Sequence, residues 1–251
     1  MTPLQSKVSN GLNNNNESNY KVDEDSQYLF CLQLSSSSFP TGSFNHSFGF
    51  ETWFSNGEID NVESFEQACV SWIKYCLATS ETVAVAKACE LSKCMDFDSL
   101  IDLDRKLSAL KLTKEAKNAS ILTGAALLET YDKAFSSGHL SEFSSAIQSG
   151  KTQGNYAVIY GIICGQNNIS AYQSALTFMQ SSVSNLTNVA SRIIPLGQID
   201  VQKILKRTWP LIIELATESL EKNSDDMYTA SANLDIASMH HEKLKTRLCM
   251  S

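Results

Sequence analysis

The stretch from residue 39 to 51 limits most strongly what this chain can fold into. It runs Phe39-Pro-Thr-Gly-Ser-Phe-Asn-His-Ser-Phe-Gly-Phe-Glu51 and follows neither a helical nor a strand period. Pro40 fixes its own φ and pushes Phe39 toward an extended conformation. Gly42 and Gly49 tolerate backbone angles that other residues avoid. We therefore predict that the chain turns here before a helix begins, with aromatic side chains packed into a core.

The same stretch carries four polar side chains that need a role, namely Ser43, His46, Ser47 and Glu51. They could cap a helix and satisfy local backbone groups. They could also contact a partner. For His46 a hydrogen-bonded side chain at a turn is favoured over a metal ligand.

Apolar residues elsewhere recur at intervals of three and four, which predicts helices. One long helix is expected from Ser64 to about Met95, and others over 114–135 and 170–190. Residues 156–164 are apolar almost all round and predict a buried helix. The pattern after Val201 predicts a further helix, kinked or restarted at Trp209-Pro210. The fold class is therefore all-α, a single domain of roughly nine or ten packed helices over residues 27–232.

The two ends of the chain differ from this domain. Residues 1–26 are polar, with asparagine at positions 13 to 16, and predict a disordered tail. Residues 28–34 form the first apolar run, for which a short helix is favoured over a strand. Residues 233–251 end the chain in a specific polar run. Such an end favours a tail that orders on a partner, and the alternative is a tail folded onto its own domain.

Composition excludes several classes of protein. A net charge of −7 argues against nucleic-acid binding. The sequence has neither an apolar run near twenty residues nor an apolar N-terminus, so a membrane span and a secretory signal are not expected. Seven cysteines, none in C-x-x-C spacing, suit reduced thiols in a cytosol. Nucleotide-binding, hydrolase and metalloprotease motifs are absent, so we expect neither an enzyme nor a resident cofactor or metal.

Two later stretches are distinctive. The first is Arg192-Ile-Ile-Pro-Leu-Gly-Gln-Ile-Asp-Val-Gln-Lys-Ile-Leu205, in which proline and glycine stop one helix, and Gln198 or Asp200 begins the next. The second is the tail, which contains the pair His240-His241. Adjacent helical residues point about 100° apart, so these two histidines alone make a poor metal site.

These stretches together resemble the urease accessory protein F (UreF) family. Residues 40–51 match its run Pro-x-Gly-Ser/Gly-Phe/Tyr-x-His/Tyr-Ser-x-Gly-Leu-Glu after a short Leu-Gln segment, with Phe50 in place of the usual leucine. Residues 192–198 match its Arg-Leu-Val-Pro-Leu-Gly-Gln. The tail matches its closing pattern at His241, Glu242, Arg247, Leu248 and Ser251.

The resemblance implies a cytoplasmic, all-α homodimer that serves nickel delivery to urease. It implies three partners: a second accessory protein (UreD, also called UreH), the nickel-carrying GTPase UreG, and the urease apoprotein. Nickel would be handled by the complex and not bound tightly by this chain. The partner-binding residues expected on this basis are Ser43, His46, Ser47, Glu51, Arg192, Gln198, Asp200, Gln202, His241, Glu242 and Arg247. We expect segments 43–51 and 198–202 to lie near each other.

Two other functions stay open. A helical protein can stimulate a GTPase by donating an arginine, for which Arg192 or Arg247 would be the candidate. A helical protein with an apolar ligand pocket is also conceivable, but no convergent polar residues support it.

Overall fold

Helix α8 (Tyr156–Gln166) lies at the centre of the fold, because its residues from Ala157 to Gly165 are all buried. It packs most extensively against α4 (Thr82–Lys93). Gly161 makes this approach possible, since a Cβ there would lie 2.4 Å from the carbonyl oxygen of Val85. The predicted buried helix is therefore confirmed.

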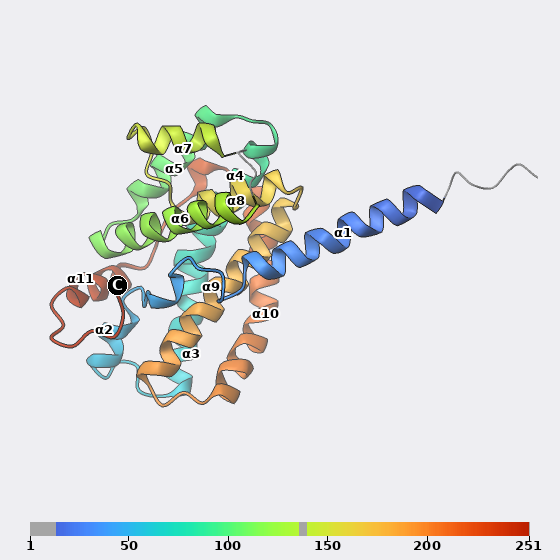
Figure 1. The fold of residues 1–251 in the computed structure, drawn as a ribbon. Coiled ribbons are helices and arrows are strands. Elements are labelled where there is room, and N and C mark those ends of the chain that lie inside the picture. The colour runs from blue at the N-terminus through green and yellow to red at the C-terminus, as the bar shows by residue number, and fades with distance from the viewer. Residues whose placement is uncertain (1–13, 136–139, 251) are drawn as a thin grey trace, which may run out of the picture.

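The computed structural model describes residues 14–135 and 140–250. Within them helices follow one another without a strand, so the all-α prediction is confirmed (Figure 1). Besides α4 and α8, the elements are α1 (Asn14–Leu34), η1 (Ser43–Asn45), α2 (Phe50–Ser55), α3 (Val62–Trp72), η2 (Ile73–Glu81), α5 (Phe97–Leu110), α6 (Lys114–Phe135), α7 (Ser141–Gln148), α9 (Ala171–Ile193), α10 (Gln198–Glu221), η3 (Ser224–Asp226) and α11 (Ala232–His241).

The long helix expected from Ser64 is continuous, but its middle third is a π-helix, η2. Two of its carbonyl oxygens, on Tyr75 and Thr79, accept hydrogen bonds from the backbone of Ala230 (2.9 Å) and Tyr228 (3.1 Å). These bonds hold the segment that leads into α11. A π-helix of this length is rare, and the apolar periodicity gives no sign of it.

Helix α1 corrects the expected N-terminal boundary. Residues 14–26, for which disorder is predicted, are helical in the structure, while residues 1–13 lie outside the described ranges. The C-terminal end of α1 is anchored by the buried side chains of Cys31 and Leu34. Figure 1 shows α1 leading away from the body of the protein. Residues 23–26 are exposed. They are helical because they continue the helix from its anchored end, not because they are buried.

Helix α10 runs through Pro210 as one element, so the expected alternative of a restarted helix is wrong. Its inner face is buried at Val201, Ile204 and Ile212, and it packs mainly on α9. Packing along this face keeps the helix continuous on both sides of the proline, where one backbone hydrogen bond is missing.

Buried Asp104 on α5 organises the loop before α8. Its carboxylate accepts hydrogen bonds from the backbone of Gly154 (2.9 Å) and Asn155 (2.7 Å) and from the Asn155 side chain (3.0 Å). A buried carboxylate is stable only when it is satisfied in this way. Across the described ranges, no helix combines the length and the apolar character needed to cross a bilayer.

Candidate functional site

The Glu51 carboxylate holds the C-terminal tail on the domain. One oxygen accepts the backbone N–H of Leu248 at 2.6 Å, and the other accepts that of Cys249 at 3.0 Å. The second oxygen also lies 2.9 Å from Nε2 of His241. Glu51 is itself buried in the first turn of α2. The first and last distinctive stretches of the sequence therefore meet at one side chain.

His241 lies between two carboxylates. Its side chain is fully buried, and its Nδ1 lies 2.8 Å from Oε2 of Glu115 on α6. Only the protonated imidazolium can donate from both ring nitrogens. Glu115 also pairs with Arg247 at 3.2 Å. We call Glu51, Glu115, His241 and Arg247 the tail clamp.

The hydrogen bonds to Glu51 outweigh the cost of its burial. Burial is the largest single influence and raises the pKa of Glu51, but the bonds from Leu248, His241 and Cys249 together bring it below its ordinary value of 4.5. Hydrogen bonds donated to a carboxylate favour its charged form. Glu51 is therefore an ionised acceptor at neutral pH.

Cys249 and Arg192 adjoin the tail clamp. Burial, followed by the charge and hydrogen bond of Glu51, raises the pKa of the Cys249 thiol to about 12, although Arg192 and Ser47 act in the opposite direction. The positive charge of Arg192, in the last turn of α9, therefore lies close enough to the tail to lower the pKa of Cys249. Cys249 is held as a neutral, unreactive thiol.

Gly49 lets α2 and α11 approach closely. Its φ is +92°, and a Cβ there would lie 2.9 Å from the carbonyl oxygen of Leu234. Nearby, the hydroxyl of Thr52 donates to the carbonyl oxygen of Ala237 at 2.8 Å. At the far end of the tail, the N–H of Met250 donates to the carbonyl oxygen of Asn45 at 2.8 Å. Both α11 and the tail therefore pack against the turn predicted around Gly49.

The tail folds onto its own domain. The sequence favoured a tail that orders on a partner, and the structure instead shows the alternative that was left open. The physical reason is the set of donors that the tail brings to Glu51 and Glu115. This arrangement also corrects the expectation that the whole turn presents polar groups outward. His46, Ser47, Glu51 and His241 are buried. Burial lowers the pKa of His46, which favours its neutral imidazole.

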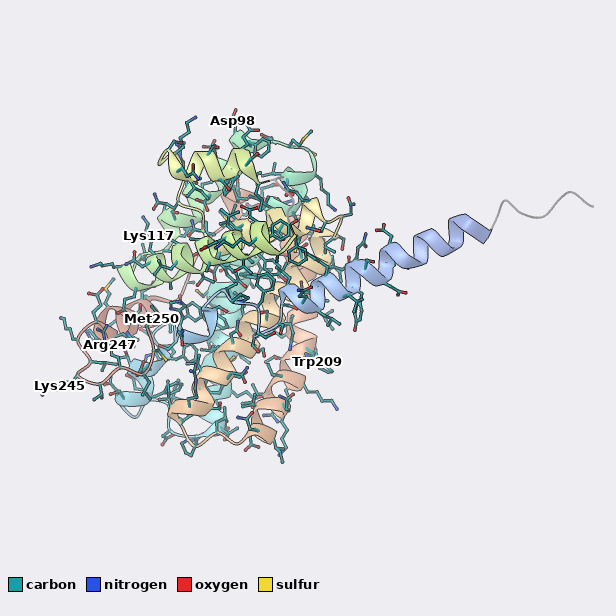
Figure 2. The ribbon with its side chains drawn as sticks, viewed as in Figure 1. Asp98, Lys117, Trp209, Lys245, Arg247 and Met250 are labelled. Atoms are coloured by element: carbon teal, nitrogen blue, oxygen red, sulfur yellow. The ribbon has the colours of Figure 1, made fainter. Side chains whose placement is uncertain are left out.

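The remaining predicted residues fall into three places. Ser43 is half-buried and accepts a hydrogen bond from Asn185 of α9 at 3.0 Å, whereas Arg192, Glu242 and Arg247 are exposed around the tail. Figure 2 shows Arg247 and Met250 on this side of the molecule.

The three predicted residues of segment 198–202 lie on the opening turns of α10 and do not belong to the tail clamp. Gln198 and Gln202 are exposed. Asp200 pairs with Lys203 on the same helix at 3.4 Å.

Sequence reasoning missed Glu115 and the backbone of Leu248 and Cys249. Glu115 stands in the first turn of α6, where an acidic residue is expected simply to favour the helix dipole. Nothing in its local pattern indicates that it faces a histidine 126 residues away. Backbone donors carry no sequence signal at all.

A groove of about 370 Å³ lies beside the tail clamp. It mixes charged and apolar side chains, and its lining includes Lys114, Glu115, Leu122, Glu242, Arg247 and Met250. Leu122 and Met250 are more than half exposed. In the described part of the chain, no group of three or more histidine, cysteine or acidic side chains is placed to hold a metal ion.

Comparison with known proteins gives a consistent result. The UreF family model matches residues 59–208. The urease accessory protein UreF of Lachnoclostridium phytofermentans is 32% identical over 227 residues, which cover 90% of this chain and all of that protein. The UreF proteins of Geobacillus kaustophilus (32% identity, 90% and 99% coverage) and Nostoc sp. (29%, 90% and 97%) align over nearly the same length.

Proposed function

The chain belongs to the UreF family of urease accessory proteins, and from this premise we propose that it is a non-enzymatic docking protein of urease maturation. In this role it bridges UreD (UreH) and the GTPase UreG in the cytoplasm, and the assembly delivers nickel to the urease apoprotein. The chain itself binds nickel only weakly, and it works as a homodimer.

The observation that carries this proposal is the tail clamp. It fixes a terminal segment that would otherwise fray, with the buried side chains of Glu51 and His241 serving as anchors. Several side chains of the tail after His241 face outward, although Cys249 is buried. Leu248 is 72% exposed and Met250 60%, beside the half-exposed guanidinium of Arg247.

Such a surface has the composition of a protein-binding site. Arginine and methionine are enriched at interfaces, and a few central side chains carry most of the binding energy. Glu115 already restricts the side chain of Arg247 in the unbound protein. Binding a partner therefore costs less side-chain conformational entropy. We assign this surface to UreD.

Co-purification with UreD tests the assignment. Arg247→Ala combined with Leu248→Ala should weaken the complex by about tenfold or more, since hot-spot residues contribute roughly 1–2 kcal/mol or more each. Lys245→Ala is the matched control, because Lys245 is exposed in the same tail but does not belong to the clamp. Equal recovery of UreD with both variants would remove the tail from the interface.

A second candidate function rests on the exposure of Arg192 and Arg247 on the same side of the protein. Either could be donated to the nucleotide site of UreG, where an arginine stabilises the charge of phosphoryl transfer. GTP turnover by UreG, measured with this protein and with each arginine replaced by alanine, separates the two functions. Docking alone predicts no arginine-dependent stimulation, whereas donation predicts its loss in one variant.

A further inference from the structure

The imidazole of His241 is held in a way that decides which ring nitrogens carry a hydrogen. Nε2 lies 2.9 Å from Oε2 of Glu51, and Nδ1 lies 2.8 Å from Oε2 of Glu115. An ionised carboxylate only accepts hydrogen bonds, whereas a neutral imidazole has a hydrogen on one nitrogen and a lone pair on the other. Two carboxylates on opposite sides of one ring therefore require an imidazolium.

The charges of the tail clamp agree with an imidazolium. Although burial acts the other way, the hydrogen bonds that Glu51 accepts bring its pKa below the ordinary value, so it is ionised at neutral pH. Glu115 uses its other oxygen to accept a hydrogen bond from Arg247 at 3.2 Å. The clamp then holds two negative and two positive groups. Without the proton on His241, Arg247 alone would balance both carboxylates.

Other titratable or charged side chains around the ring do not replace this proton. They are His46, Lys114, Arg192, His240, Glu242 and Cys249. Burial lowers the pKa of His46 and favours its neutral imidazole, while burial and then Glu51 raise the pKa of the Cys249 thiol to about 12. The other four are exposed, so solvent and salt screen their charges. The proton on His241 therefore sets the charge of the buried clamp.

Losing this proton is costly only while the tail is closed. The side chains of Glu51 and Glu115 are 5% and 11% exposed. The backbone N–H groups of Leu248 and Cys249 cover the Glu51 carboxylate. Water can solvate an unbalanced carboxylate only after these donors have left, and a buried unbalanced charge is strongly unfavourable. In an open tail, water solvates the carboxylates and a neutral imidazole faces no unpaired charge.

We propose that His241 is a proton-dependent latch: closing the tail takes up one proton, held between Glu51 and Glu115, and the tail is released as the pH rises. Above about pH 6.5, where a solvated imidazole gives up its proton, the closed tail holds one proton more than the open tail. The closed state therefore loses stability with rising pH, and the open fraction should grow by up to about tenfold per pH unit. The consequence for docking rests on the proposed function, because the surface assigned to UreD exists only while the tail is closed.

Amide hydrogen exchange of the C-terminal peptide between about pH 6 and 9, corrected for intrinsic exchange, tests the latch. The unaltered chain should lose protection by up to about tenfold per pH unit. Glu115→Gln should abolish this dependence, because the glutamine amide can donate to Nδ1 while a neutral ring still donates to Glu51. His240→Gln is the matched control, since it removes an exposed imidazole one residue away and should keep the full dependence. A flat profile in the unaltered chain, or an equal slope in Glu115→Gln, overturns the latch.

NMR of the ring nitrogens covers the case in which Glu115→Gln opens the tail at every pH. In the unaltered chain both ring nitrogens of His241 should carry hydrogens at about pH 7.5, where a solvated imidazole is mostly neutral. A bare ring nitrogen in the protected tail overturns the latch. Both measurements use this chain alone, so a failed latch leaves docking to the UreD co-purification, and a failure to bind UreD leaves the latch standing.

Discussion

Replacing Glu51 with glutamine should open the tail while leaving the helical domain folded. The carboxylate accepts three hydrogen bonds, from Leu248, Cys249 and His241. Glutamine offers one oxygen in place of two, and its amide group must then face at least one of these donors. At least one charge-assisted bond is lost, and the others become weaker.

The magnitude follows from these bonds. A hydrogen bond to a charged group contributes about 1.5–3 kcal/mol, and an unsatisfied buried donor adds its own cost. We therefore expect the closed tail to lose about 2–4 kcal/mol, which raises the open fraction about 30- to 700-fold at 1.4 kcal/mol per factor of ten.

Amide hydrogen exchange of the C-terminal peptide measures this change directly, because exchange reports local opening. Glu242→Gln is the matched control, since Glu242 adjoins His241 but is exposed. The peptide should exchange faster by the stated factor in Glu51→Gln and remain unchanged in the control. Unchanged protection in Glu51→Gln would refute the reasoning that Glu51 holds the tail.

Three further predictions follow from the same contacts. Gly49→Ala should lower the free energy of unfolding by about 1–3 kcal/mol in urea titration, because a Cβ at φ +92° meets the carbonyl of Leu234. Asp104→Asn should cost about 2–4 kcal/mol by the same assay with the m-value unchanged, since an amide cannot satisfy every donor before α8. Because the pKa of Glu51 is lowered, its contribution is present above the ordinary value of 4.5 and is lost as the pH falls through the lowered one. Tail protection, corrected for intrinsic exchange, should fall in that acid range in the unaltered chain and show no such step in Glu51→Gln.

Much of the fold could be predicted because it follows from periodicity. The helices over 64–95 and 114–135 carry regular apolar stripes, and residues 156–164 are apolar almost all round. The turn at Gly49 is indicated by the glycine itself. The π-helix at 73–81 could not be predicted, because it preserves the apolar pattern while changing only the hydrogen-bond register. The helical state of residues 14–26 was missed because a polar composition indicates only that a segment cannot be buried. It does not show whether a neighbouring helix continues through that segment.

The site was predictable in its parts but not in its assembly. Glu51 and His241 stand out as polar residues in specific contexts, yet their hydrogen bond spans 190 residues along the chain. Local pattern could not show that both are buried, nor that Glu115 completes the clamp. Segment 198–202 was grouped with them by motif alone. The helix predicted to begin at Gln198 or Asp200 is confirmed as α10, whereas its nearness to segment 43–51 stays a prediction.

The bridging role is tested most directly by asking whether UreG joins UreD only through this protein. Purified UreD and UreG would be mixed with and without the full chain, and the mass of the resulting complexes measured by size-exclusion chromatography with light scattering. We predict a complex containing all three proteins, and no comparable association of UreD with UreG when the chain is left out. Association of UreD with UreG that is equally strong without the chain would contradict the account.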